Sequence, residues 1–302
     1  MTIDRERLRR LLNVEPPAIT LNGRDTEERD GWVLERLRFE LAGEGTARGF
    51  LARPPGPGPH PAILYGHAHG GRFDVGAGEF LDGQTYISQP PLGPVFGQAG
   101  YVTLMLEMPC FGERATVTES AASKALNWYG KSLIGAMLSD HAAALGWLAA
   151  REDVDSARIG AFGISMGCIL SYWLAAVDLR IAATAHLCCL ADFATMIELG
   201  AHDKHGAYLT VPGLLAETSP GQIAGLIAPR PQLACFGALD PLTPPAAREL
   251  ACAEAERAYA ALGATEELSL FVNPSAGHEE TQAMRAAVLD FFARRLGSAR
   301  SR

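Results

Sequence analysis

The sequence predicts an α/β fold built on a mostly parallel sheet with helices on both faces. Short apolar runs of the kind that form buried parallel strands alternate along the chain with longer segments of helical periodicity. The expected strands are 61–66, 101–108, 158–164, 181–188, 232–239 and 268–273, and the expected helices are 126–151, 166–176, 245–262 and 279–296. Such alternation is typical of a single parallel sheet covered by helices on both sides.

Two segments depart from this alternation. Residues 32–41 and 46–53 are predicted to form a hairpin around the turn at 43–45, which would add an antiparallel edge to the sheet. Residues 190–229 interrupt the pattern and are the candidate for a small cap over the carboxyl edge of the strands. No repeat or linker divides the sequence, so we expect a single domain over 1–302 with an N-terminal extension at 1–30.

Composition argues against several classes of protein. The chain has 34 acidic and 26 basic side chains and a net charge of −8, whereas phosphate-backbone binding requires clustered Lys and Arg. Its apolar runs are much shorter than the ~20 residues of a membrane span, and its charged start lacks the apolar core of a secretory signal. Six cysteines without a C-x-x-C pair indicate reduced thiols. We expect a cytoplasmic protein with a small-molecule partner and neither a nucleic-acid nor a membrane partner; the sequence does not define its oligomeric state.

The segment Gly163-Ile164-Ser165-Met166-Gly167 matches the pattern G-x-S-x-G between a predicted strand and a predicted helix. Two glycines allow the sharp turn that lifts a serine hydroxyl clear of the sheet at a helix N-terminus, where the dipole favours negative charge. The alternative is a glycine-rich connection with an incidental serine. Because both flanks have the required structure, the pattern predicts a nucleophile at Ser165.

A serine nucleophile needs a base, and in this strand–turn–helix setting the chain order is Ser, acid, His. His278 is the only histidine beyond residue 205, and it follows the predicted strand 268–273 by five residues. Asp240 ends the predicted strand 232–239, which places it at the same edge of the sheet, although a turn or capping role is an alternative. The rivals by chain order alone are Asp178, Asp192 and Asp203.

An oxyanion hole requires preorganised N–H donors beside the nucleophile. We expect one from the backbone of Met166 and one from the backbone of His69, in the small-residue segment 67–71 after a predicted strand. An alternative makes His67 and His69 metal ligands, but the sequence shows no third ligand for them.

These motifs resemble the α/β-hydrolase superfamily, specifically its dienelactone hydrolase-like and acetyl-xylan-esterase-like bacterial branch. The matching segments, from about residue 30 to the end, are His67-Ala-His-Gly-Gly, Phe111-Gly-Glu-Arg, Gly163-Ile-Ser-Met-Gly, Leu239-Asp-Pro and Gly277-His-Glu. Ser165 stands where dienelactone hydrolases have cysteine, and Glu107 stands where the superfamily commonly has aspartate. For Glu107 we consider a structural role, such as a hydrogen bond to the oxyanion loop.

The resemblance implies hydrolysis of carboxylic esters with short acyl groups such as acetyl, through an acyl-enzyme and without a cofactor or metal. The alternatives are a prolyl-oligopeptidase-like peptidase or amidase, and a catalytically inactive binding module on the same fold. The candidates for the substrate pocket are His67, Glu107, His202, Tyr208, Val211 and Leu214. The segment 202–205 also contains potential zinc ligands, but its place in the expected cap favours hydrogen bonds among its own side chains and with the cap backbone.

Overall fold

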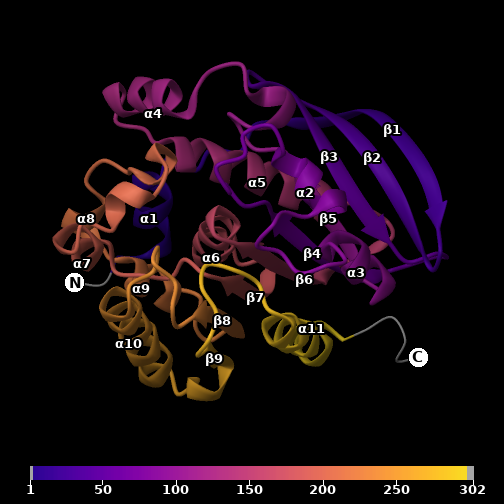
Figure 1. The fold of residues 1–302 in the computed structure, drawn as a ribbon. Helices are drawn as coiled ribbons and strands as arrows, with labels where there is room; N and C mark the ends of the chain where they lie inside the picture. The colour runs from indigo at the N-terminus through magenta and orange to yellow at the C-terminus, as the bar shows by residue number, and fades with distance from the viewer. Residues whose placement is uncertain (1–2, 298–302) are drawn as a thin grey trace.

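The centre of the fold is a sheet in which nine strands of the described residues, 3–297, are hydrogen-bonded in the order β1-β2-β3-β5-β4-β6-β7-β8-β9 (Figure 1). The strands of this computed structural model are β1 Ile19–Arg29, β2 Trp32–Leu41, β3 Gly45–Arg53, β4 His60–Gly66, β5 Val102–Leu106, β6 Val154–Ile164, β7 Ile181–Leu187, β8 Gln232–Gly237 and β9 Leu268–Asn273. Strands β4 to β9 run parallel, and β1 to β3 form an antiparallel edge.

Helices cover both faces of this sheet (Figure 1). The helices are α1 Arg5–Leu11, α2 Glu79–Asp82, α3 Leu92–Gln98, α4 Glu119–Trp128, α5 Leu133–Ala149, α6 Met166–Val177, α7 Phe193–Glu198, α8 Leu214–Glu217, α9 Pro220–Gly225, α10 Pro245–Ala261 and α11 Gln282–Leu296. Short 3-10 turns are η1 Gly76–Gly78, η2 Gly112–Arg114, η3 His202–Lys204, η4 Ala207–Leu209 and η5 Thr265–Glu267. Within residues 3–297, no helix combines the length and apolar character needed to span a lipid bilayer.

The side chains of strand β4 contribute to two hydrophobic cores, one on each face of the sheet. Ala62 and Leu64 pack in the layer that contains α1, α5 and α6, whereas Ile63 and Tyr65 pack in the layer of α2, α3 and α11. Successive side chains of a strand point to opposite faces, so a strand buried on both sides must be apolar throughout. The predicted α/β architecture is therefore confirmed.

The antiparallel edge contains one more strand than the sequence predicted. Strand β1 lies in the segment 1–30 that we expected to be an extension, and it pairs with β2 along its whole length. None of its residues is fully buried, and its second half is charged. A half-exposed polar edge strand carries no apolar run, so hydrophobic periodicity missed it.

The predicted helix 126–151 is two helices. Helix α4 ends at Trp128, and Gly130 follows with φ +69°, a conformation that stops a helix. The Ser132 hydroxyl then accepts a hydrogen bond from the Gly135 N–H at 3.1 Å and caps the start of α5. Gly130 and Ser132 were therefore the signal of a break that apolar spacing alone did not show.

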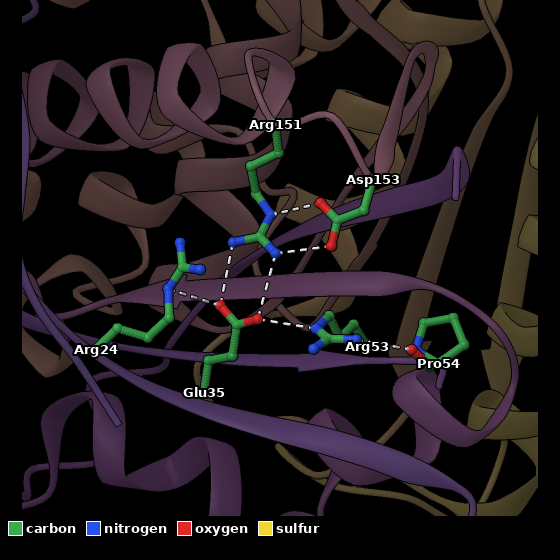
Figure 2. A network of polar contacts seen from close by, with 6 residues as sticks. All are labelled: Arg24, Glu35, Arg53, Pro54, Arg151 and Asp153. Carbon is green, nitrogen blue, oxygen red and sulfur yellow. Dashed lines mark hydrogen bonds and ion pairs between the residues drawn. The ribbon is translucent and has the colours of Figure 1, made fainter. Parts of the chain in front are cut away.

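In addition to the β3–β5 pairing, a buried carboxylate on β2 links the antiparallel edge to the parallel part of the fold. Glu35 is 2% exposed and accepts hydrogen bonds from Arg53 at 2.8 Å and Arg151 at 3.1 Å, with Arg24 at 3.4 Å (Figure 2). Burial alone would raise the pKa of Glu35, but the bonds from Arg151 and Arg53 outweigh it and lower the pKa. Asp153, just before β6, holds the other side of the Arg151 guanidinium (Figure 2).

We expect Glu35→Ala to lower the free energy of unfolding by about 3 kcal/mol, because it leaves the half-buried Arg53 guanidinium without its carboxylate and Arg151 with Asp153 alone. Urea titration measures this loss. The control Glu27→Ala removes a carboxylate from exposed pairs and should cost less than about 1 kcal/mol.

A titration of stability against pH provides a second readout. Because the pKa of Glu35 is lowered in the folded state, its contribution is present above the ordinary glutamate value of about 4.3 and is lost as the pH falls through the folded-state pKa. The stability gap between wild type and Glu35→Gln should therefore shrink in acid. A gap that is independent of pH would contradict this role.

Candidate active site

Ser165 occupies the sharp turn between β6 and α6. Its φ of 58° and ψ of −116° lie outside the regions that most residues adopt, and its N–H is held by the Leu187 carbonyl at 3.0 Å. A side chain at Gly167 would overlap the Gly66 carbonyl oxygen, and one at Gly163 would overlap the Gly167 backbone. The two glycines thus allow β4, β6 and α6 to approach closely enough to form the predicted turn.

The structure brings the three residues of the predicted serine–histidine–aspartate set into one hydrogen-bonded chain. Ser165 Oγ lies 2.9 Å from His278 Nε2, and His278 Nδ1 lies 2.7 Å from Asp240 Oδ2. The other carboxylate oxygen of Asp240 accepts the Leu242 N–H at 2.8 Å, so both oxygens have partners. Asp240 is 4% exposed, whereas His278 and Ser165 are half-buried. The serine hydroxyl is therefore positioned to donate to Nε2 while Nδ1–H donates to the carboxylate.

The ends of β8 and β9 bring Asp240 and His278 together. The N–H groups of Ala238 and Leu239, after β8, donate to the carbonyls of Asn273, at the end of β9, and Ala276, after it, at 2.8 and 2.9 Å. A side chain at Gly237 would overlap the backbone that leads to His278. The Asp240 loop and the His278 loop are consequently fixed to each other by the backbone.

The rival aspartates are occupied elsewhere or lie at the surface. Asp178 binds Arg180 at 2.6 Å, and Asp192 caps α7 by accepting the Thr195 N–H at 2.8 Å. Asp203 is exposed on η3. Of the four candidates, Asp240 is the one bonded to His278.

The predicted oxyanion loop, residues 67–71 after β4, contains backbone N–H groups with and without acceptors. Ala68 N–H donates to the buried Glu79 carboxylate at 3.1 Å. The His69 N–H has no protein acceptor within the described part of the chain. Met166 is the first residue of α6, so its N–H has no carbonyl one turn earlier in the helix. Both N–H groups that the sequence nominated for the oxyanion hole thus lack a backbone acceptor within the described residues.

The proposed pocket roles of His67 and Glu107 are wrong. His67 is 0% exposed; its Nδ1–H donates to the Ala68 carbonyl at 3.0 Å, and its Nε2 accepts the Met108 N–H at 3.1 Å. Burial lowers the pKa of His67 to about 4, so the ring is neutral. Both ring nitrogens are occupied by backbone, which leaves none for a substrate.

Glu107 is also 0% exposed and is hydrogen-bonded to the backbone of two neighbouring loops. It pairs with Arg48 at 2.6 Å and accepts the N–H groups of Glu113 at 2.8 Å and Ala77 at 3.3 Å. The expected bond to the oxyanion loop comes instead from Glu79, whose pKa is raised to about 7 by burial. The sequence signal for Glu79 was weak because it lies in the glycine- and proline-rich stretch where no element was predicted.

The His69 ring makes contacts that the sequence did not predict. Its Nε2 lies 2.5 Å from Glu119 Oε2, and its Nδ1 accepts the Gly71 N–H at 3.0 Å. The ring also stacks on Tyr208 at 5.5 Å and meets Phe111 edge-on at 5.3 Å. Phe111 starts the Phe-Gly-Glu-Arg segment, which explains one motif that had no assigned role. Glu119 stands next to Thr118, the N-cap of α4, and only that capping pattern could have drawn attention to it.

The cap candidates separate into two groups. His202, Val211 and Leu214 line a cavity of about 450 Å³ within residues 193–215, whereas Tyr208 is 2% exposed and packs on His69. His205 also borders this cavity, and its Nε2–H donates to the Leu242 carbonyl at 2.9 Å, beside the Asp240 loop. The expected side-chain network within segment 202–205 is wrong, because His205 turns to the Asp240 loop and His202 and Asp203 remain exposed.

Metal-ligand atoms gather at a different place. Cys188, Asp240 and His278 have ligand atoms within 4.8 Å of one another, the one such group found in residues 3–297. Asp240 and His278 are already hydrogen-bonded to each other, and burial raises the pKa of the Cys188 thiol well above its ordinary value. The group therefore consists of a hydrogen-bonded imidazole–carboxylate pair with a protonated thiol beside it.

The sequence is similar to that of a known protein over nearly its whole length. No protein-family model matches the sequence. A protein of Bacillus subtilis (strain 168) named "Putative hydrolase YtaP" is 34% identical over 291 residues, which are 95% of this chain and 97% of that protein.

Solved structures with the same fold are esterases by name. Methylesterase BT1017 superposes with a TM-score of 0.73 at 22% identity, and this chain, 96% covered, spans 62% of its length. Acetyl xylan esterase 1 from Thermoanaerobacterium sp. JW/SL YS485 gives 0.67 at 19% identity, covering 96% of this chain and 92% of that one. A glucuronoyl esterase from Solibacter usitatus gives 0.66 at 15% identity, with 97% and 92% covered.

The nine-stranded sheet with its flanking helices is thus the α/β-hydrolase fold. Within it, this chain belongs to the family of the Bacillus subtilis protein YtaP, with which it aligns over nearly its whole length.

The geometry of the turn predicts that alanine substitutions at Gly167 and Gly146 affect stability in opposite directions. Gly167→Ala should destabilise the protein by at least about 2 kcal/mol, because the new methyl group would overlap the Gly66 carbonyl and a packed backbone cannot move away cheaply. Thermal unfolding followed by circular dichroism measures the loss.

Gly146→Ala in helix α5 is the matched control. Its methyl group would meet only Arg180 Nη1 at 3.6 Å, so the higher helix propensity of alanine should stabilise the protein by about 1 kcal/mol or less. Equal effects of the two substitutions would contradict the close approach of α6 to β4.

Proposed function

We propose that this protein is a serine hydrolase that cleaves carboxylic esters with short acyl groups, such as acetyl, through an acyl-enzyme. The observation that carries the proposal is the continuous hydrogen-bonded chain from Ser165 through His278 to Asp240. It is supported by the strained turn that presents the serine and by the two backbone N–H groups, of His69 and Met166, that have no carbonyl acceptor.

The proposed reaction follows from these contacts. His278 Nε2 takes the Ser165 proton as Oγ bonds to the ester carbonyl carbon, and Asp240 stabilises the imidazolium through Nδ1–H. The N–H groups of His69 and Met166 stabilise the negative carbonyl oxygen. The imidazolium then gives its proton to the departing alcohol, which leaves an acyl-serine. Water attacks that ester by the same steps in reverse, which releases the acid and restores Ser165.

The identity of the nucleophile is supported by the environment of the next thiol along the chain. Cys168, one helical turn after Ser165, is 0% exposed, and burial raises its pKa well above the ordinary value. A protonated thiol beneath the surface is a poor nucleophile. The half-buried hydroxyl of Ser165 is the group that faces the base.

The choice of esters is supported by the relatives. The solved structures of the same fold include two named as acetyl xylan esterases and a methylesterase, and the Bacillus protein is named as a hydrolase. An acetyl or similarly small acyl group is our choice because acetyl xylan esterases recur among these structures.

We expect Ser165→Ala to lower kcat for a short-chain aryl ester by roughly 10³-fold or more without changing the melting temperature appreciably. A fluorophosphonate should label wild-type protein at Ser165. Ser275→Ala, in the exposed loop before His278, is the control and should retain both activity and labelling. Near-normal turnover by the Ser165 variant would show that another group performs the attack.

We expect Asp240→Asn to keep the fold and to lower kcat by about 10³–10⁴-fold, because an amide favours the histidine tautomer with its proton on Nε2. That tautomer cannot accept the Ser165 proton. The comparison is Asp203→Asn, which changes an exposed carboxylate on η3 and should leave kcat within about twofold. The reverse order of effects would move the orienting acid to the cap.

A further inference from the structure

The Glu119 carboxylate is buried between the oxyanion loop and the cap. It is 7% exposed at the start of α4, where one oxygen binds His69 Nε2 at 2.5 Å and the other accepts the Tyr208 N–H at 3.1 Å. Tyr208 belongs to η4, so a single side chain joins three segments that lie far apart in the sequence.

The direction of the hydrogen bond to His69 is fixed by its other neighbour. Because the Gly71 N–H donates to Nδ1, that nitrogen carries a lone pair and the ring proton resides on Nε2. Nε2–H therefore donates to Glu119. The ring is neutral, and both of its nitrogens are satisfied.

Packing removes the remaining freedom of the His69 ring. Tyr208 stacks on it with an interplanar angle of 27°, and Phe111 and Phe73 meet it edge-on with centroids at 5.3 and 4.9 Å. The ring can leave this position only by breaking its bond to Glu119 and its contacts with three aromatic side chains. Since the ring and the backbone N–H belong to one residue, fixing the ring restricts the direction of the N–H.

Glu119 performs this role as an anion. Burial alone would raise its pKa, but the bond from His69 and the N–H groups of Tyr208 and Ala207 outweigh it, so the pKa is lowered. Hydrogen bonds to a carboxylate are shorter and about twice as strong as those between neutral groups. The ionised side chain is thus the strongest of the polar contacts that hold the His69 ring.

We propose that Glu119 is a positioning residue for catalysis: through the His69 ring it aims the His69 N–H at the oxyanion, and through Tyr208 it makes that alignment depend on a seated cap. The proposal rests on the proposed serine hydrolase function. Glu119 holds the donor in place and does not touch the reacting atoms. It therefore affects the stabilisation of the transition state more than the binding of the substrate.

The first test compares Glu119→Gln and Glu119→Ala with wild type. Each kcat is expressed per active site, titrated with a fluorophosphonate, so that misfolded protein is not counted. We expect kcat to fall about 10-fold for glutamine, which retains one acceptor oxygen, and about 10²-fold for alanine, as for a misplaced oxyanion donor. KM should change less than about threefold. Affinity for an alkylboronic acid, which forms a tetrahedral adduct on the serine, should fall by the same factor as kcat.

The second test is a double-mutant cycle with His69→Ala, which keeps the backbone N–H and removes the ring. If Glu119 acts through the ring, the double variant should be no slower than the slower single variant, within about threefold. Losses that multiply would show that Glu119 acts independently of His69, for example on the substrate itself, and would overturn the proposal. Glutamine remains the decisive variant if alanine does not fold.

Controls separate this proposal from simpler explanations. Glu113→Gln changes an exposed glutamate on η2 whose side chain pairs with Arg38, and it should retain wild-type kcat. A Glu119→Gln protein with a lower melting temperature but an unchanged kcat per site has lost only a structural contact, which refutes the proposal. Full activity in Ser165→Ala refutes the underlying function, whereas an inactive Ser165→Ala with unchanged Glu119 variants refutes the Glu119 role alone.

Discussion

The close approach of α6 to β4 is the constraint on which the rest of the structure depends. Gly66, Gly163 and Gly167 let three backbone segments meet without side chains between them, and Ser165 is held with positive φ where they meet. Strain of this kind persists only when the surroundings fix it from several directions. Here the neighbouring strand supplies a backbone acceptor, the helix begins at the next residue, and the imidazole of His278 receives the hydroxyl.

Buried carboxylates accept hydrogen bonds from backbone N–H groups of the loops, as neighbouring strands do within the sheet. Glu79, Glu107 and Glu119 each accept backbone N–H groups from loop segments that have no ladder partner. Loops at the carboxyl edge would otherwise leave these donors unsatisfied, which costs free energy in the interior. Their pKa values are shifted in different directions: burial raises those of Glu79 and Glu107, whereas at Glu119 the hydrogen bonds together outweigh burial and lower the pKa.

The sequence was informative where one short pattern had one structural meaning. The turn around Ser165, the aspartate that ends a strand, and the last histidine of the chain could each be placed because parallel strands bring their carboxyl ends to one edge. The roles of His67, Glu107 and Glu119 could not be placed, since they depend on which loop reaches which carboxylate, and loop paths have no periodicity. Strand β1 was missed because its place is set by pairing with β2, while its own side chains remain partly or fully exposed to solvent.

The polar character of β1 has a consequence for how copies of this protein meet. An outer strand offers unpaired N–H and C=O groups to any extended chain, and flat apolar outer strands seed aggregation. Asp25, Glu28 and Arg29 are exposed on β1, so a second copy that docked there would have to strip water from charged groups. The side of the sheet that contributes nothing to the site therefore protects the protein from extending its sheet into a fibre.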